Sequence, residues 1–395
     1  MNIKLSRWTR LGISVLALLC AGIIYAWSFL KVPIQQLYGW DPRSSMLQLN
    51  YTLTLCFFCL GGLLSGFSAK LLNPAVRMGI GGALVAGGFA IVSALDGSSA
   101  FLLYLGYGIM AGLGIGIVYN VIIASTNAWF PDKKGLCSGC MMLGFGFSAM
   151  VLGNLATALF GSSLGWSGTF LTYGLSIGAL LALCGLFIRP PMPGEVPPTA
   201  AKSGDAVADV DTPTMLKRHS FWLLFALCTI IGAVGSTAIA QAKDFMAAVD
   251  PTAAALAVAG ASMISVMNGA GRLIIGAMFD RFGLRKTQTF VSCLLVIAPL
   301  TMLAALLSSS AVIGFVGLCL CGFAFSSAPI VTTTFTLAFF GKKHFPQNFP
   351  VLTLTLIPAS FAPTLAGGFS LTTTYIALCV LALVGAGVNY LIKEP

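Results

Sequence analysis

The chain has 395 residues, of which 57% are hydrophobic and only 8% are charged, and its mean hydropathy is +0.95. Soluble domains carry about 25% charged residues, so this composition excludes an ordinary soluble protein. The formal net charge of +10 by itself suggests a nucleic-acid partner, but the positions of the basic residues argue against one. We predict an all-α membrane protein that crosses the bilayer many times.

Apolar runs long enough to cross a membrane recur along the whole chain. A spanning helix needs about 20 apolar residues, and such runs lie near 11–34, 46–69, 76–95, 101–128, 136–161, 167–188, 220–242, 253–278, 288–308, 311–339, 349–369 and 371–391. The first run follows a basic stretch, as a signal peptide does, but it continues through residues 25–28 without a small-residue cleavage site. We therefore predict twelve transmembrane helices, the first of them retained.

The basic residues predict an orientation. If the amino terminus is cytoplasmic, all 21 Lys and Arg residues except Lys31, Arg43, Lys243 and Arg272 fall on the cytoplasmic side. An excess of Lys and Arg in cytoplasmic loops is the positive-inside rule. We expect a multi-pass protein of the plasma or inner membrane with both termini in the cytoplasm, surrounded by lipid and without a nucleic-acid partner.

All eleven cysteines fall in predicted spans. Two pairs, Cys56/Cys59 and Cys137/Cys140, have a spacing that also occurs in redox and zinc sites. Inside lipid-embedded helices we interpret them as small packing residues. Because no nucleophile, base or metal cluster is visible either, we expect no metal, no cofactor and no enzymatic activity.

A segment rich in Pro, Ala and Asp separates the sixth and seventh runs. It covers residues 189–219, has mixed charge and shows no helical periodicity, so we interpret it as a flexible cytoplasmic linker. The predicted domains are an amino-terminal six-helix half at 1–188, this linker, and a carboxy-terminal six-helix half at 220–395.

The two halves are similar to each other at a constant offset of 210 residues. The matching positions are Gly66/Gly276, Gly112/Gly322, Phe130/Phe340 and Lys133/Lys343. Two parallel six-helix halves related about an axis along the membrane normal place a substrate site near the midplane between them. The repeat therefore predicts a transporter.

The residues that close the eighth run carry a family signature. The stretch Gly276-Ala277-Met278-Phe279-Asp280-Arg281-Phe282-Gly283-Leu284-Arg285-Lys286 resembles the loop signature of the major facilitator superfamily. In that family the acid and the basic residues form a cytoplasmic gate network, which implies gating roles for Asp280, Arg281 and Arg285. The first-half copy departs from the pattern, since Lys70 stands in place of the acid and Asn73-Pro74 in place of the second Gly.

Four further stretches resemble the oxalate:formate antiporter branch of that superfamily, which carries monocarboxylates and dicarboxylates. They are residues 25–28, 112–119, 129–135 and 268–272. The resemblance covers both halves, omits the linker, and implies two pseudo-symmetric six-helix halves. The Gly-x-Gly-x-Gly pattern within 112–119 also occurs in nucleotide loops, but no strand precedes it here, so we interpret it as close helix packing.

The functional interpretation depends on Arg272. It lies eight residues before Asp280, so at 1.5 Å per residue it is about 12 Å inside the membrane. An ion pair within the protein would explain such an arginine, but all eleven acidic residues fall in predicted loops or helix ends. An uncompensated charge there costs roughly 2.5–3.5 kcal/mol. We therefore expect a substrate carboxylate, which matches the guanidinium with two parallel hydrogen bonds.

Four other residues are candidates for substrate contact. Asn268 lies one helical turn before Arg272 and shares its face, where it orients the guanidinium or the ligand. The resemblance places Tyr25, Gln48 and Tyr119 in the lining of the amino-terminal half of the cavity. A membrane Tyr is otherwise an interfacial anchor, but Tyr25 and Tyr119 lie well inside their runs.

Departures from the antiporter branch predict the substrate. Oxalate-carrying members have a second cation in the eleventh helix, at the position that Leu356 occupies here. In the tenth helix, Ser327 and Val331 replace bulky aromatic residues, and Ser326 and residues 332–334 supply hydroxyls. The resemblance therefore implies a site with one cation and a preference for a monocarboxylate.

We expect a monomeric secondary transporter that moves a small organic anion, a monocarboxylate, by alternating access. With no acid in any predicted span, antiport or facilitated diffusion is favoured over proton coupling by a side chain. Two alternatives stay open: a transporter-like membrane sensor of an organic anion, and a carrier of a neutral or amphipathic solute.

Overall fold

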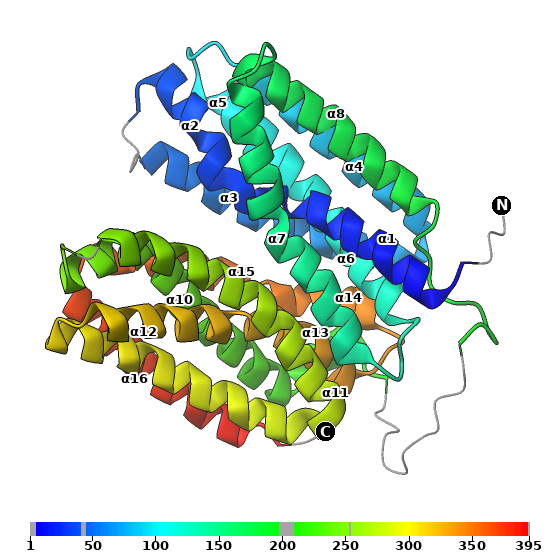
Figure 1. Cartoon of the computed structure of the whole chain (residues 1–395). Helices are drawn as coiled ribbons and strands as arrows, with labels where there is room; N and C mark the ends of the chain where they lie inside the picture. The colour runs from blue at the N-terminus through cyan, green and yellow to red at the C-terminus, as the bar shows by residue number, and fades with distance from the viewer. Residues whose placement is uncertain (1–4, 41–44, 197–208, 253, 394–395) are drawn as a thin grey trace. The chain divides into compact units, whose positions relative to one another are not determined.

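The computed structural model describes residues 5–40, 45–196, 209–252 and 254–393, and every regular element among them is a helix (Figure 1). The chain divides into two compact units. The first unit comprises residues 1–132, 140–202 and 349–351, and the second comprises 133–139, 203–348 and 352–395. The all-α membrane architecture predicted from composition is confirmed.

The first unit consists of helices joined by short turns. They are α1 (Arg7–Ala21), the 3₁₀ segment η1 (Gly22–Ala26), α2 (Trp27–Tyr38), α3 (Ser45–Phe67), η2 (Ser68–Lys70), α4 (Pro74–Ser93), α5 (Ala100–Leu103), the π-helical segment η3 (Tyr104–Ala111), α6 (Gly112–Asn127), α7 (Lys134–Phe160) and α8 (Gly165–Gly185). The first turns of α7, up to Gly139, group with the second unit.

The second unit repeats this organisation. Its helices are α9 (Thr212–Lys217), α10 (His219–Val249), α11 (Ala254–Ser308), α12 (Ala311–Phe325), α13 (Ser327–Phe340), α14 (Phe345–Thr353), α15 (Leu356–Ala366) and α16 (Leu371–Leu391). One stretch within α14, residues 349–351, groups with the first unit. The short helix α9 lies inside the predicted linker, where the sequence shows no helical periodicity.

Eleven helical stretches of the described chain are long and apolar enough to cross a membrane. One of them, Val266–Ser308, consists of two helices in series, because Gly283 breaks α11 with φ 79° and ψ −178°. It therefore includes the second half of the eighth predicted run and all of the ninth, which brings the count to the predicted twelve. The loop expected between these two runs is shorter than predicted, since helical geometry resumes directly after Gly283.

Polar caps set the starts of several helices. Ser6, Asn73, Ser310 and Ser370 each accept a hydrogen bond from the backbone N–H three residues on, at the starts of α1, α4, α12 and α16. Each cap satisfies one of the N–H groups that a helix start leaves open. Within hydrocarbon the helix itself satisfies the other backbone groups, which is why apolar runs of this length fold as helices.

Glycines in the first unit bring helix backbones into contact. A Cβ added to Gly116 of α6 would lie 1.9 Å from the carbonyl oxygen of Phe58 in α3. Gly82 of α4 and Gly178 of α8 approach each other in the same way, at 2.5 and 2.6 Å. No side chain fits at such distances. The Gly-x-Gly-x-Gly pattern is therefore a helix-packing feature, as interpreted.

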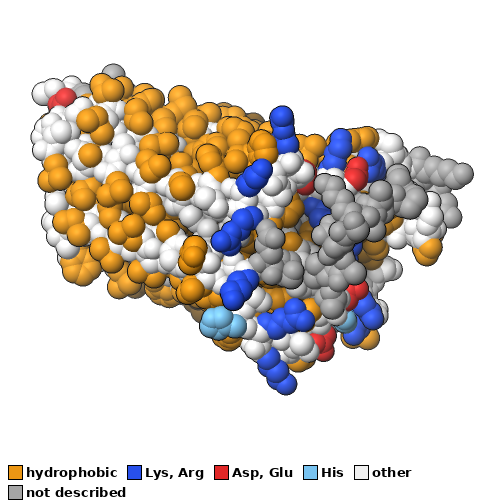
Figure 2. Space-filling view, turned by 90° about the horizontal axis from the view of Figure 1, so that it is seen from below, with side chains coloured by type: hydrophobic (Ala, Val, Ile, Leu, Met, Phe, Trp, Pro, Cys, Tyr) orange, Lys and Arg blue, Asp and Glu red, His pale blue; other side chains and the backbone are white. Residues whose placement is uncertain are grey.

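Apolar and basic side chains occupy different parts of the surface. In Figure 2, hydrophobic side chains cover much of one part of the visible surface, whereas Lys and Arg side chains gather on another part. Each unit exposes large apolar residues on its spans, such as Leu183 at 60% in α8 and Val380 at 57% in α16. Exposed apolar side chains on spanning helices are suited to contact with lipid.

Candidate functional site

The polar residues singled out in the eighth run lie together on α11. Arg272 is only 2% exposed, and its Nε donates a long hydrogen bond of 3.4 Å to Oδ1 of Asn268. The two residues lie one helical turn apart on the same face of the helix. Asn268 thus helps to fix the direction of the guanidinium.

The backbone around Arg272 is held by close contacts. A Cβ added to Gly139, in the first turns of α7, would lie 2.8 Å from the carbonyl oxygen of Arg272. A Cβ added to the preceding Gly271 would lie 2.2 Å from Oγ of Ser326. Arg272 is therefore positioned by packed helices, which is the arrangement that holds a binding group in a fixed geometry.

Two turns further along α11, a carboxylate holds the start of α7. Oδ1 of Asp280 accepts from the N–H of Gly135 at 2.8 Å, and Oδ2 accepts from the N–H of Leu136 at 2.7 Å. Hydrogen bonds with a charged acceptor are strong, and a helix start offers both open N–H groups and the positive end of the helix dipole. We call Asp280 with Gly135 and Leu136 the α7 clasp.

The α7 clasp and Arg272 belong to one helix contact. A Cβ added to Gly276 would lie 2.2 Å from the carbonyl oxygen of Gly135, and one added to Gly135 would lie 2.1 Å from that of Gly276. Gly276 is midway between Arg272 and Asp280 in the sequence, and the eight residues of helix between them span about 12 Å. Any displacement of the start of α7 along this face therefore changes the clasp and the surroundings of Arg272 together.

The two basic residues of the predicted gate have other neighbours. The guanidinium of Arg281 lies over the ring of Phe282, 5.4 Å from its centroid. Nη1 of Arg285 donates to the carbonyl oxygen of Ile392 at 3.1 Å, directly after α16. Asp280 makes the contact with α7, and these two arginines contact the loop itself and the carboxy-terminal end of the chain.

The predicted cavity residues of the amino-terminal half belong to an aromatic cluster in the first unit. The ring centroids of Tyr25 and Tyr119 each lie 5.1 Å from that of Phe145. Tyr119 is 7% exposed and its hydroxyl donates to Sδ of Met142 at 3.3 Å, whereas Tyr25 is half-buried in η1. The structure thus brings these two tyrosines together through Phe145. The side chain of Gln48 lies outside the described part of the structure.

Two spans of the second unit are interrupted along their length. α12 and α13 meet at Ser326, and α14 and α15 meet at residues 354–355, directly before Leu356. Irregular backbone at membrane depth occurs where it is buried in protein or lines a cavity. Ser326 is fully buried and abuts Gly271, next to Arg272, so the first interruption is part of the candidate site.

The hydroxyls expected in the tenth span are directed to their own helix. Thr332, Thr333 and Thr334 each donate from Oγ1 to the carbonyl oxygen four residues earlier, at 2.7 to 2.8 Å, and Ser326 donates to that of Phe323. A hydroxyl has a single proton to donate. In this conformation these residues therefore offer lone pairs to a ligand, and an anion depends more on the guanidinium than the sequence suggests.

A second carboxylate contact lies in a place that sequence reasoning missed. Oδ1 of Asp209 accepts from the N–H groups of Lys342 and Lys343 at 2.8 and 2.9 Å, in the turn before α14, and the N–H of Val210 donates to the carbonyl oxygen of Phe340 at 3.0 Å. We call Asp209 with Lys342 and Lys343 the α14 clasp. Its acid comes from the segment interpreted as a flexible linker, and no residue pattern around Asp209 indicates the contact.

Asp244 and the cysteines are the other candidate chemical groups in the helices. α10 continues past its predicted end at 242 to Val249, so Asp244 lies within its last turns rather than in a loop. The cysteines are free thiols. Within the described residues, no group of three or more His, Cys, Asp or Glu side chains is placed to hold a metal ion.

Comparison with known proteins agrees with this architecture. A family model described as the major facilitator superfamily matches residues 11–349. The chain belongs to this superfamily. Among solved structures, the proton:xylose symporter XylE has the same fold, with a TM-score of 0.74, 12% identity, and coverage of 98% of this chain and 97% of that one. The chain is therefore a multi-pass membrane transporter.

Curated relatives support the predicted branch. The chain is 28% identical over 291 residues to the oxalate:formate antiporter of Oxalobacter formigenes, in a match that covers 72% of this chain and 66%, just under two thirds, of that relative. It is also 28% identical over 195 residues to apicoplast pyruvate carrier 1 of Toxoplasma gondii, covering 39% of this chain and 36% of that one. The predicted resemblance to the antiporter branch is confirmed.

Proposed function

We propose that this transporter carries a small monocarboxylate by alternating access, as a monomer, with Arg272 binding the carboxylate. One observation carries the proposal: a guanidinium that is 2% exposed within a spanning helix, oriented by Asn268 and placed beside the interruption at Ser326. The relatives named for oxalate and formate and for pyruvate support the same class of substrate.

The guanidinium favours a carboxylate for geometric reasons. Its planar fork donates two parallel hydrogen bonds to the two oxygens of one carboxylate, which a lysine ammonium does not reproduce. A dicarboxylate would bring a second charge out of water, which costs several kcal/mol without a second cation. The predicted resemblance aligns Leu356 with that second cation, which supports a single-cation site that favours monoanions.

The α7 clasp supplies a route from binding to conformational change. A ligand shifts a conformational equilibrium only by its difference in affinity for the two states. Because Arg272 and Asp280 share one packed face of α11, a carboxylate on Arg272 alters the same helix contact that the clasp closes. Asp280 is engaged in the clasp, which supports exchange or facilitated diffusion of the anion over proton carriage by a side chain.

Transport by purified protein in liposomes tests the proposal. Labelled formate, lactate or pyruvate should be taken up, and unlabelled monocarboxylates should compete at lower concentrations than oxalate. Leu356→Lys should shift the competition toward oxalate, whereas Ile357→Lys, which adds the same charge one residue later, should not. If no monocarboxylate is transported, or if oxalate is the best competitor for the unmodified protein, the proposal is wrong.

We further propose that both termini and residues 189–219 lie in the cytoplasm, at the plasma or inner membrane. The gathering of Lys and Arg side chains on one part of the surface in Figure 2 supports this orientation. Single cysteines placed at Ser203 or Gly204, in a protein without its native cysteines, should resist impermeant thiol reagents added to intact cells. Labelling of these cysteines by a reagent added outside the cells would show that the orientation is the opposite of the one proposed.

A further inference from the structure

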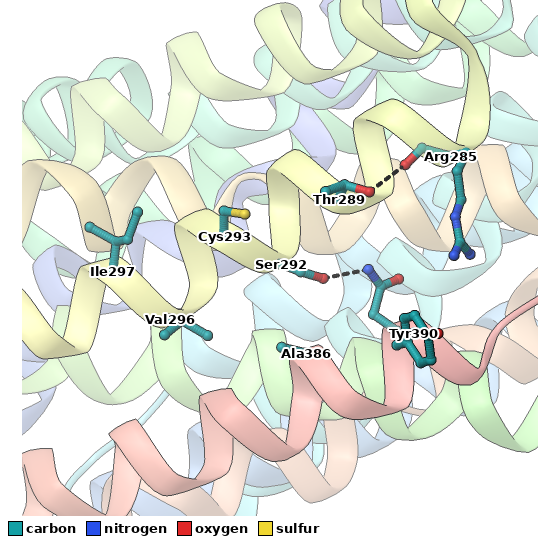
Figure 3. A pocket seen from close by; sticks show the side chains of 9 residues that line it. Arg285, Thr289, Ser292, Cys293, Val296, Ile297, Ala386 and Tyr390 are labelled. Atoms are coloured by element: carbon teal, nitrogen blue, oxygen red, sulfur yellow. Dashed lines mark hydrogen bonds between the residues drawn. The ribbon is translucent and has the colours of Figure 1, made fainter.

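A groove lies between α16 and the part of α11 that follows Gly283, within the second unit (Figure 3). Its volume is about 400 Å³. Arg285, Thr289 and Ser292 line one part of it, and Val296, Ile297 and Ala386 line another. It lies beyond the helix break from Arg272 and the α7 clasp, so it is separate from the proposed substrate site; of the predicted gating residues, it shares only Arg285.

The groove opens on the surface that faces lipid. Of its lining residues, Tyr390 is 77% exposed and Ile297 is 50% exposed. The neighbouring turns of α16 expose Val380 and Leu383 at 57% and 59%. Apolar side chains exposed along spanning helices contact acyl chains, so the occupant of this groove comes from the bilayer.

The polarity of the groove changes along its length. Figure 3 shows the Arg285 side chain extending from α11 toward α16 at one end, with Val296 and Ile297 near the opposite end. The twelve residues of helix from Arg285 to Ile297 span about 18 Å. A cation at one end and apolar side chains at the other end of this length match a phosphate headgroup followed by an acyl chain.

Hydrogen bonds fix the polar end of the groove. Nη1 of Arg285 donates to the carbonyl oxygen of Ile392 at 3.1 Å, which uses one of the five guanidinium N–H groups. Asn389, 6% exposed, donates to the carbonyl oxygen of Gln288 at 3.1 Å and to Oγ of Ser292 at 2.5 Å. Oδ1 of Asn389 has no hydrogen-bond partner among the described atoms. An unsatisfied buried oxygen is costly, and a headgroup hydroxyl supplies the donor it lacks.

We propose that this groove binds an anionic glycerophospholipid, with its phosphate on Arg285 and one acyl chain along Val296 and Ile297. Lys286 follows Arg285, and Lys393 follows Ile392, so the basic end favours a net negative headgroup over a zwitterionic one; Glu394 lies outside the described residues. Basic pockets between transmembrane helices bind anionic headgroups in this way.

Native mass spectrometry of the delipidated, detergent-purified protein tests the headgroup. Phosphatidylglycerol should be retained in preference to phosphatidylcholine of the same acyl chains. Arg285→Gln should weaken phosphatidylglycerol binding about fivefold, which corresponds to about 1 kcal/mol per basic residue. Arg281→Gln removes the same charge from a side chain that lies over Phe282, and it should retain the lipid. Equal binding of both lipids, or equal loss in both variants, would overturn the proposal.

The native Cys293 reports whether the lipid occupies the groove itself. Cys293 lines the groove and is exposed, whereas the other ten cysteines are buried or half-buried. Phosphatidylglycerol should slow the labelling of Cys293 by N-ethylmaleimide, and inorganic phosphate should not. Ala386→Trp, which fills the groove and keeps Arg285, should lose the lipid in the mass spectrum. Unchanged labelling with bound phosphatidylglycerol, protection by phosphate, or full lipid binding by Ala386→Trp would contradict a groove-bound lipid. None of these results depends on transport.

Discussion

The starts of α7 and α14 occupy corresponding places in the two copies of the 210-residue repeat. A carboxylate binds backbone N–H groups at each of them, but the two acids come from different parts of the sequence. In the α7 clasp, Asp280 at the end of a spanning helix accepts from two N–H groups at the start of α7. In the α14 clasp, Asp209 from the linker accepts from two N–H groups in the turn before α14. The chemistry is the same, a carboxylate on consecutive backbone donors, but the position of the acid in the sequence is not.

The residues at the repeated positions explain the difference. At an offset of 210, the counterpart of Asp280 is Lys70 and the counterpart of Leu136 is Pro346. Lysine has no acceptor and proline has no N–H, so the acid and one of the two N–H donors of the α7 clasp are missing in the other copy. The linker supplies an acid to neighbouring donors instead. A degraded motif therefore does not imply that the corresponding loop is unrestrained.

Among substitutions at the two clasps and the linker, removing the charge of Asp280 should have the largest effect on turnover. Each hydrogen bond to a charged group contributes about 1.5–3 kcal/mol, and Asp280→Asn keeps one acceptor, so the clasped conformation should lose enough stability to slow turnover about tenfold. Substrate affinity should stay within twofold if Asp280 acts in the gate, as proposed, and does not contact substrate. Uptake rates in liposomes and binding in detergent separate the two quantities.

A matched control is Asp132→Asn in the first unit. Asp132 pairs with Arg7 at 2.7 Å in a half-exposed ion pair, and exposed pairs contribute little, so turnover should remain within twofold. A large loss of affinity with normal turnover in Asp280→Asn would place Asp280 in the substrate site rather than in the gate.

The α14 clasp should matter less than the α7 clasp. Asp209 and Asp280 are both exposed, but a single oxygen of Asp209 receives both N–H groups, whereas Asp280 offers one oxygen to each donor, so each donor in the α14 clasp is bound less strongly. Asp209→Asn should slow turnover about twofold to threefold and raise hydrogen exchange in residues 340–348. An effect as large as that of Asp280→Asn would make the linker an equal part of the gate; unchanged exchange would show that Asp209 does not hold this turn.

A substitution near the amino-terminal end of the linker, at Glu195, should have the smallest effect on turnover. Glu195 accepts two hydrogen bonds of 2.6 Å from Arg189 and one from the N–H of Met192, which lowers its pKa from 4.5 to about 2. Because the folded-state pKa is lowered, this contribution is present above pH 4.5 and is lost only as the pH falls toward 2. Glu195→Gln should therefore leave turnover and its pH profile unchanged between pH 5 and 8. A pH-dependent change in this range would assign the linker's amino-terminal end a role in transport.

The helices could be predicted from the sequence because hydrocarbon leaves the backbone few alternatives. Apolar run length gave the twelve spans, since in lipid each helix must satisfy its own hydrogen bonds. The break at Gly283 falls in the predicted gap between the eighth and ninth runs, but the interruptions at Ser326 and residues 354–355 could not be located in this way. Their positions depend on packing between helices, which does not change the hydropathy of a run.

Those parts of the candidate site that depend on the spacing of side chains along one helix could be predicted from the sequence. Arg272 and Asn268 share a face because they are four residues apart, and a hydrogen bond joins them. The partners of Asp280 and Asp209 are backbone N–H groups, which every residue except proline possesses, so the sequence does not specify them. The hydroxyls of residues 332–334 likewise bond to their own helix, which is the local competition that Ser and Thr allow.

The central claim is that Arg272 binds the substrate carboxylate, and the substrate affinity of the variant Arg272→Lys tests it most directly. Arg272→Lys keeps the charge but loses the bidentate geometry, so it should weaken binding of the transported monocarboxylate at least tenfold and abolish uptake, with an unchanged melting temperature. The control is Arg77→Lys, since Arg77 is also buried, at 7% exposure, but donates from Nη1 to the carbonyl oxygen of Ser65 at 2.8 Å. That variant should keep its affinity. If Arg272→Lys binds and transports the anion as the unmodified protein does, Arg272 is structural and the carboxylate is bound elsewhere.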